Sequence, residues 1–192
     1  MINSIKSIIR DSISLKQAIL EDEEIMTNLL KVIYVITNCI KNGKKVMLAG
    51  NGGSAADSQH FAAELVGKIS SDRVPLPAIA LTTDTSIITA VSNDYDFTEI
   101  FARQIKAIGN PGDVIVLIST SGNSPNLLKA AQEAKNKGII SIGLLGRNGG
   151  KLKDMVDIAV VVKHDNTQRI QEAHIMIEHI ICELIEQILT SS

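Results

Sequence analysis

The sequence is poor in the residues that mark several specialised classes of protein. Tryptophan is missing, and the 192 residues include only two tyrosines, three phenylalanines, four prolines and two cysteines. Cys39 and Cys182 form neither a CxxC pair nor a spaced metal-binding pattern. We therefore expect both to be buried free thiols in a reducing cytosol. With 45% hydrophobic and 21% charged residues, the chain is neither disordered nor collagen-like.

Long apolar runs and a strong charge of either sign are missing as well. Charged residues such as Lys6 and Arg10 interrupt the N-terminal isoleucines, so we expect no signal peptide. No apolar stretch reaches the roughly 18 residues of a membrane span. A formal net charge of -2 disfavours nucleic-acid binding through bulk charge. These absences predict a single soluble cytoplasmic domain that binds neither nucleic acid nor membrane.

The N-terminal segment has a helical pattern. Residues 2–42 contain no proline or glycine, and their isoleucines and leucines recur at steps of three and four residues. This spacing predicts two helices, the second ending at Gly43. Isoleucine and valine occur on more than one face of the second helix, which predicts burial on two sides. A partner subunit is one way to supply that burial.

Beyond Lys45 the pattern changes to short apolar runs, each followed by turn residues and a helix-length segment. Such a repeat predicts an α/β fold with a doubly wound, five-stranded parallel sheet. The closing segment has the length of one long helix, Thr167–Leu189. We interpret the chain as one domain, 1–192, in which helices of 1–42 serve oligomer packing and 43–192 form the α/β core. The predicted strands are 46–49, 78–81, 114–118, 139–145 and 158–162.

Ligands of parallel sheets bind at the carboxyl ends of the strands, so the loops after the predicted strands are the first candidates for a site. The loop STSGNSP follows the third strand and carries four hydroxyl groups, those of Ser119, Thr120, Ser121 and Ser124. Ser124 and Pro125 have the sequence of a helix start. Hydroxyls and free backbone N–H groups at a helix N-terminus predict a phosphate-monoester site. The alternative is a serine-rich turn that only caps the helix.

The loop after the first strand, GNGGSA at residues 50–55, fits the glycine pattern of dinucleotide-binding sites. A nicotinamide enzyme is therefore a competing interpretation. Its acidic partner would be Asp84, which lies about thirty residues beyond the loop where about twenty are usual. A glycine fingerprint this short is a weak signal.

The segment after the glycine loop brings two potential metal ligands onto one helix face. His60 and Glu64 are four residues apart and could bind a divalent metal or act as a base and its partner. The alternative is a solvated helix pair. Ile170, Ile177, Ile181 and Leu184 mark the buried stripe of the last helix, so some of its polar groups must face water. Its candidate ligands are Gln168, Gln171, Glu172, His174, Glu178, His179 and Glu183.

Spacing alone leaves the choice among these ligands open. His174 and Glu178 form the simplest pair, at four residues. Gln171 and His179 are eight residues, or about 12 Å, apart along the helix axis. Both would need to converge on one ion.

Four segments together identify a family. GNGGSAADSQHFAAEL, TTDTSIITAVSNDYDFTEIFARQ, STSGNSPN and RIQEAHIMIEHI resemble, in order and over nearly the whole chain, the phosphoheptose isomerases of the sugar isomerase (SIS) family. The resemblance implies conversion of sedoheptulose 7-phosphate to D-glycero-D-manno-heptose 7-phosphate, for bacterial lipopolysaccharide core or capsule. It also implies a cytoplasmic homotetramer with sites between subunits and one zinc ion per subunit.

Carried over by position, the resemblance assigns zinc ligation to His60, Glu64, Gln171 and His179. Our hypothesis makes Glu64 the base and His179 the acid of an enediol mechanism, with zinc polarising the sugar oxygens. A zinc-bound carboxylate is a poorer base, so either Glu64 leaves the metal or the metal mainly positions the substrate. The substrate contacts implied are Asn51, Gly52, Gly53, Glu64, Asn93, Asp94, Ser119, Thr120, Ser121, Ser124 and Gln171.

The main rival is a non-catalytic protein of the same fold that binds phosphosugars or partner proteins. The resemblance extends to bacterial replication initiator-associating proteins, which lack the residues equivalent to Glu64 and His179. Both are present here, which favours the enzyme. Isomerisation of a shorter phosphosugar stays open, as does the metal, because such ligands suit several divalent ions.

Overall fold

A five-stranded, all-parallel sheet forms the centre of the molecule in the computed structural model, which describes residues 1–69 and 72–191. The strand order is β2-β1-β3-β4-β5. All residues of β1 and β3 are buried, as expected when helices cover both faces of a parallel sheet. The predicted doubly wound sheet is confirmed. The strands are β1 (Val46–Gly50), β2 (Ala78–Ala80), β3 (Val114–Ser119), β4 (Ile140–Gly146) and β5 (Ile158–Val162).

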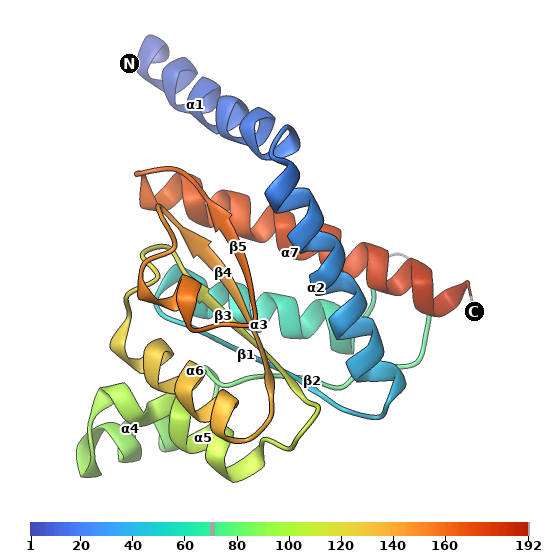
Figure 1. The fold of residues 1–192 in the computed structure, drawn as a ribbon. Coiled ribbons are helices and arrows are strands. Elements are labelled where there is room, and N and C mark those ends of the chain that lie inside the picture. Colours follow the sequence, from blue (N-terminus) through green and yellow to red (C-terminus); the bar gives the residue numbers. More distant parts are fainter. Residues whose placement is uncertain (70–71, 192) are drawn as a thin grey trace.

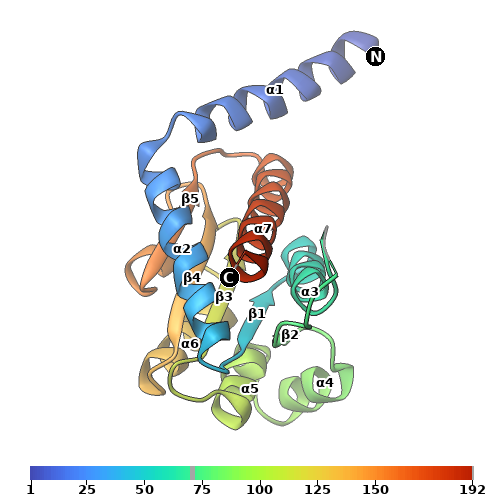
Figure 2. The ribbon, with the colours of Figure 1, turned by 90° about the vertical axis from the view of Figure 1, so that its right-hand side faces the viewer.

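Helices pack on both faces of this sheet (Figures 1 and 2). The core of one face is formed with α2 (Glu23–Lys41), α3 (Gly53–Val66) and α7 (Thr167–Thr190). The core of the other face is formed with α5 (Ile100–Ile108) and α6 (Pro125–Asn136), and α4 (Thr85–Asp94) packs against α5. These two layers separate the candidate ligands of α3 and α7 from the residues of α4.

Two connections differ from the regular alternation that the sequence predicts. β4 is followed only by a short 3-10 helix, η2 (Lys151–Asp154), because Gly149 and Gly150 adopt positive φ and turn the chain. Between β2 and β3 the chain forms α4, a second 3-10 helix, η1 (Phe97–Glu99), and α5, in place of one helix.

The first helix, α1 (Ile2–Leu20), projects from the body of the molecule (Figures 1 and 2). Only Leu15 and Ile19, near its C-terminal end, are buried. Its other large apolar side chains are exposed, with more than half of each accessible to solvent: Ile2, Ile5, Ile8, Ile9, Ile13 and Leu20. The two N-terminal helices are confirmed, and the second ends at Lys41, just before Gly43. Their predicted role in oligomer packing stays a prediction.

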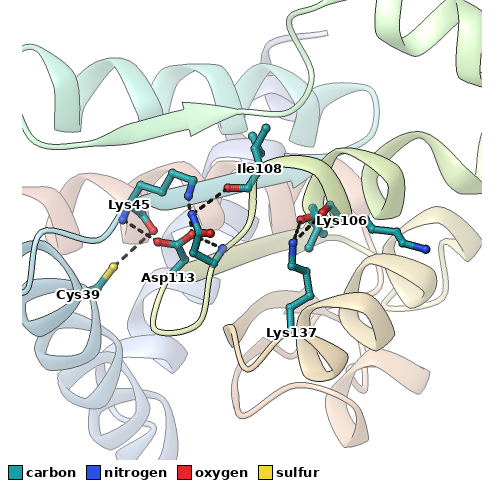
Figure 3. Close-up of polar contacts among 8 residues, drawn as sticks. Cys39, Lys45, Lys106, Ile108, Asp113 and Lys137 are labelled. Carbon is teal, nitrogen blue, oxygen red and sulfur yellow. Dashed lines mark hydrogen bonds and ion pairs between the residues drawn. The ribbon is translucent and has the colours of Figure 1, made fainter.

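A polar cluster fixes the amino ends of β1 and β3, opposite the edge where ligands are expected (Figure 3). Asp113 accepts hydrogen bonds from the backbone N–H of Lys45 and Asn110, and its Oδ2 lies 2.5 Å from Lys45 Nζ. Burial alone would raise the pKa of Asp113, but the bonds from Lys45 and Asn110 outweigh it and lower the pKa. Cys39 joins the cluster by donating from Sγ to the Lys45 carbonyl. This end of the sheet therefore serves stability.

Both cysteines are buried and free within the described part of the chain, as predicted. Burial raises the pKa of the Cys39 thiol to about 11. Among the helices of residues 1–69 and 72–191, none has the length and apolar character needed to cross a membrane.

Candidate metal and substrate site

Three potential metal ligands meet where α3 and α7 lie side by side (Figure 2). His60 Nε2 lies 2.7 Å from His179 Nε2 and 3.4 Å from Glu64 Oε1. One donor atom from each of the three side chains lies within 4.8 Å of the others. We call His60, Glu64 and His179 the ligand group.

The spacing of residues along α3 explains why its polar side chains face α7. Gly53, Asp57, His60 and Glu64 follow one another at steps of four, three and four residues, which places them on one stripe of the helix. Next to this stripe, Phe61 is fully buried and anchors α3 on the sheet.

Gly50 lets this helix begin close to the end of β1. A Cβ on Gly50 would lie 2.4 Å from the Ser54 carbonyl oxygen, so no larger residue fits without a shift. The tight glycine loop therefore brings the N-terminal turn of α3 to the carboxyl edge of the sheet.

The chemistry of the ligand group fits a divalent cation. Two imidazole nitrogens at 2.7 Å cannot both carry a proton, and a shared cation would satisfy both lone pairs. Imidazole and carboxylate are the nitrogen and oxygen ligands that zinc takes. Side chains of His60 and Glu64 keep 39% and 22% of their surface exposed, so a substrate can reach the group.

Gln171 lies close to the glycine loop and to Asp57. Its Nε2 donates a 2.6 Å hydrogen bond to Asp57 Oδ1, and its Cγ would lie 3.5 Å from a Cβ on Gly53. Gln171 therefore connects the loop to the α3 stripe that carries His60. Its role as a fourth ligand stays a prediction.

The serine loop takes the shape that an anion site requires. Ser119 ends β3 and accepts a 3.0 Å hydrogen bond from the Gly122 N–H, and its hydroxyl lies 3.5 Å from that of Ser124. Ser124 is the N-cap of α6, as predicted, but within the described residues its hydroxyl makes no capping hydrogen bond. Capping alone therefore does not explain these hydroxyls. Ser121 and Thr120 lie beside them, each partly exposed.

Cations lie beside this loop that sequence analysis did not single out. An open cavity of about 530 Å³ at the carboxyl ends of β3, β4 and β5 is lined by Ser121, Arg147, Lys163 and His164, among others. Lys163 also pairs with Asp22 at 3.0 Å. Arg147, with φ of 58°, was not identifiable because no motif marks the end of β4. Because Asp165 also lines the cavity and Lys163 is paired, Arg147 is the lining cation best placed to favour a phosphate near Ser121.

A reciprocal pair of amides joins the glycine loop to the serine loop. Asn51 Nδ2 donates to Asn126 Oδ1 at 2.9 Å, and Asn126 Nδ2 donates to Asn51 Oδ1 at 2.8 Å. Asn126 is buried at the start of α6, and spacing gave no signal for a contact across 75 residues. The pair fixes the distance between the two predicted substrate loops.

Asn93 and Asp94 are the predicted site residues that the fold of one chain keeps apart from the ligand group. Both are exposed at the end of α4, where Asn93 Nδ2 donates to Asp94 Oδ1 at 2.8 Å. α4 belongs to the layer on the other face of the sheet from α7 (Figure 1). Their role in substrate binding stays a prediction.

His174 and Glu178, the simplest pair by spacing, are both buried and lie outside the ligand group. His174 Nε2 lies 3.1 Å from the Leu145 carbonyl, and burial lowers the pKa of His174 to about 4. Burial, with a contribution from the Asp57 charge, raises the pKa of Glu178 to about 8. His179, and not His174, lies beside His60 and Glu64 because of how α7 packs against α3, which helix spacing alone does not predict.

Asp84, the acid of the nicotinamide interpretation, is occupied elsewhere. It is the N-cap of α4 and accepts a 2.9 Å hydrogen bond from the Ile87 N–H. A carboxylate committed to a helix cap does not serve a ribose.

Comparisons with known proteins place the chain in a family. The family model described as SIS domain matches residues 10–146. Phosphoheptose isomerase of Sulfurimonas denitrificans is 49% identical over 183 residues, covering 95% of this chain and 94% of the relative. That of Aneurinibacillus thermoaerophilus is 51% identical over 183 residues, covering 95% and 92%.

Solved structures give the same result. Phosphoheptose isomerase GmhA from Neisseria gonorrhoeae has a TM-score of 0.90 at 40% identity and covers 96% of this chain and 98% of its own. A phosphoheptose isomerase from Francisella tularensis has a TM-score of 0.93 at 39% identity, covering 97% and 98%.

The parallel sheet, the serine loop at its carboxyl edge and the matching family model define a protein of the sugar isomerase class, and the chain belongs to the SIS-domain family. Within that family it belongs with the phosphoheptose isomerases over nearly its whole length, and it is an aldose–ketose isomerase.

Proposed function

We propose that this chain converts sedoheptulose 7-phosphate to D-glycero-D-manno-heptose 7-phosphate. The observation that carries the proposal is the meeting of His60, Glu64 and His179 between α3 and α7, in a chain whose serine loop follows β3. The relatives named phosphoheptose isomerase support the choice of a seven-carbon phosphosugar. A base, an acid and an anion site are the parts that the reaction needs.

The serine loop holds the phosphate end of the sugar. Hydroxyls of Ser119, Thr120, Ser121 and Ser124, with backbone N–H groups at the start of α6, donate hydrogen bonds to the phosphate oxygens. Arg147 on the adjoining cavity adds positive charge. Anchored at this end, the sugar extends its carbonyl carbons toward the ligand group.

At the reacting end, Glu64 takes a proton from C1 of the ketose and returns it to C2, while His179 donates a proton to the C2 carbonyl oxygen and removes one from the C1 hydroxyl. His60, Glu64, Gln171 and His179 are the residues that would hold one zinc ion per subunit. When bound, the ion supplies polarisation of the sugar oxygens. Glu64 is effective as a base only while its carboxylate is free to accept the proton.

The assembly is part of the same proposal. The exposed apolar face of α1, and the distance of Asn93 and Asp94 from the ligand group, support a homotetramer whose sites lie between subunits. We place the enzyme in the cytoplasm, supplying heptose for lipopolysaccharide core or capsule.

Incubation of the purified protein with sedoheptulose 7-phosphate tests the function. We expect an aldose 7-phosphate product, loss of turnover after chelation, and recovery on adding zinc. The non-catalytic alternative predicts binding of the sugar phosphate without any product, and that outcome would refute the enzyme. Elemental analysis of the protein as purified identifies the metal.

A further inference from the structure

We infer that Asp57 is a positioning residue that sets the orientation of the Gln171 amide, so that Gln171 Oε1 is the atom available to a bound cation or sugar hydroxyl. The inference deepens the proposed function and rests on the assignment of Gln171 to the site. Nothing in the sequence motifs separates Asp57 from the other residues of its helix.

The contact itself is short and enclosed. Gln171 Nε2 lies 2.6 Å from Asp57 Oδ1, a distance typical of a strong, charge-assisted hydrogen bond. Asp57 is only 1% exposed, so water competes little for its oxygens. The bond joins α3 to α7 across 114 residues, one helical turn before His60 on α3.

The chemistry of Asp57 and Gln171 favours one orientation of the Gln171 amide. A glutamine amide can turn over and exchange its oxygen for its NH₂ group, and only the oxygen binds a cation. Asp57 Oδ1 is the acceptor in the contact with Gln171 Nε2, so it holds the NH₂ end of Gln171. The oxygen is then the end of the Gln171 amide that does not bond Asp57. Partners behind a metal ligand commonly act in this way, and their loss costs about 10- to 100-fold in metal affinity.

Burying the carboxylate of Asp57 destabilises the folded state, which argues for a role beyond packing. Within the described residues its second oxygen, Oδ2, is buried without a hydrogen-bond partner. An apolar residue would fill the same place without this cost. Stability alone therefore does not account for a carboxylate here.

Zinc affinity, measured by calorimetric titration of the full-length protein, tests the inference without relying on turnover. Asp57→Leu removes the acceptor, and we expect the Kd for zinc to rise about 10- to 100-fold. Asp57→Asn keeps the size of the side chain but can hold either end of the Gln171 amide, so we expect a rise in the Kd between those of the wild type and Asp57→Leu. In a Gln171→Ala background, Asp57→Leu should change the Kd by less than about twofold, since the residue through which it acts is gone.

Ser58→Ala is the matched control, because Ser58 is the next residue on α3, fully buried, and bonds only its own helix through the Ser54 carbonyl. Its Kd should equal that of the wild type. Unfolding curves for all variants separate loss of fold from loss of orientation. Wild-type affinity in a folded Asp57→Leu protein, or losses that add in the double variant, would overturn the inference. Failure of the isomerase assay in the wild type would instead overturn the proposed function.

Discussion

A single substitution at Glu64 can test its proposed role as a base without changing the hydroxyls that we assign to phosphate binding. Its Oε1 lies 3.4 Å from His60 Nε2, whereas the hydroxyls assigned to the phosphate belong to β3 and the start of α6. Glutamine keeps the shape of the side chain and removes its basicity.

We expect Glu64→Gln to lower kcat by about 10²- to 10⁴-fold, the usual contribution of a general base. Inhibition by inorganic phosphate should stay nearly the same, because the serine loop is intact. Steady-state kinetics with sedoheptulose 7-phosphate measure both quantities. Glu183→Gln, at an exposed glutamate of α7, is the control. Near-normal turnover of the Glu64 variant would contradict its role as the base.

Glu178 makes the stability of the metal-free protein depend on pH. Burial raises its pKa from an ordinary 4.5 to about 8, so between these values the folded chain holds a proton that the unfolded chain releases. The free energy of unfolding should therefore fall as pH rises through this interval and level off above about 8.

Glu178→Gln removes this titration, so its unfolding free energy should fall less steeply over the same interval. Denaturant unfolding of both metal-free proteins, from about pH 5 to 8.5, measures the difference. The comparison cancels the contribution of His174, whose lowered pKa acts in both. Parallel curves would show that Glu178 titrates normally.

At the scale of elements, a buried ion pair holds the C-terminal end of α3 against α7. Arg73 Nε lies 2.9 Å from Glu186 Oε2, and its Nη atoms donate to the carbonyls of Glu64 and Leu65 at 2.8 and 2.9 Å. The side chains of Arg73 and Glu186 are 5% and 2% exposed. Arg73 therefore fixes the backbone of Glu64 while linking it to the helix that carries His179.

Arg73→Met removes the guanidinium from beside a buried carboxylate, and we expect it to lower the unfolding free energy by about 3–5 kcal/mol. Lys129→Met breaks the exposed Lys129–Glu99 pair, at 47% and 33% exposure, and should change it by less than about 1 kcal/mol. Urea unfolding compares the two. Equal effects would contradict a special role for the buried pair.

The elements themselves were largely predictable from sequence. Strand runs are apolar because both faces of the sheet are covered, so all five were identified to within a residue or two at each end. The split into α4 and α5 was missed, because no proline or glycine interrupts residues 82–108. Local helix spacing predicted the His60–Glu64 pair but could not choose His179 over the other ligands of α7.

That choice depends on how two helices distant in sequence are aligned. The Asn51–Asn126, Asp57–Gln171 and Arg73–Glu186 contacts span 75, 114 and 113 residues. Each is a long-range pairing with no local pattern. Family resemblance therefore predicted which residues carry the chemistry, and the structure adds the partners that support them.

At the scale of the whole molecule, α1 has an apolar face that a single chain leaves exposed to solvent. Ile2, Ile5, Ile9 and Ile13 lie at steps of three and four residues, and each exposes more than half of its surface. Burying one such side chain contributes about 1.5–3 kcal/mol. In the proposed tetramer, a second copy of the chain covers this apolar face of α1.

The double substitution Ile5→Glu/Ile9→Glu should therefore dissociate the tetramer, because each glutamate would have to be desolvated in the contact. Sedimentation velocity measures the mass, and circular dichroism checks that the chain stays folded. Lys16→Glu, an exposed change of charge on the same helix, should leave the mass unchanged. A tetramer that survives the double substitution, or a monomeric wild type, would contradict this arrangement.

The ligand group has a thermodynamic consequence for the entire fold. His60 and His179 are 119 residues apart in the chain and meet only when α3 and α7 are packed together. An ion that needs both has little affinity for the denatured ensemble, so by mass action each tenfold excess over its dissociation constant adds about 1.4 kcal/mol to the native state. If the proposed zinc site is correct, the melting temperature should therefore rise with zinc concentration.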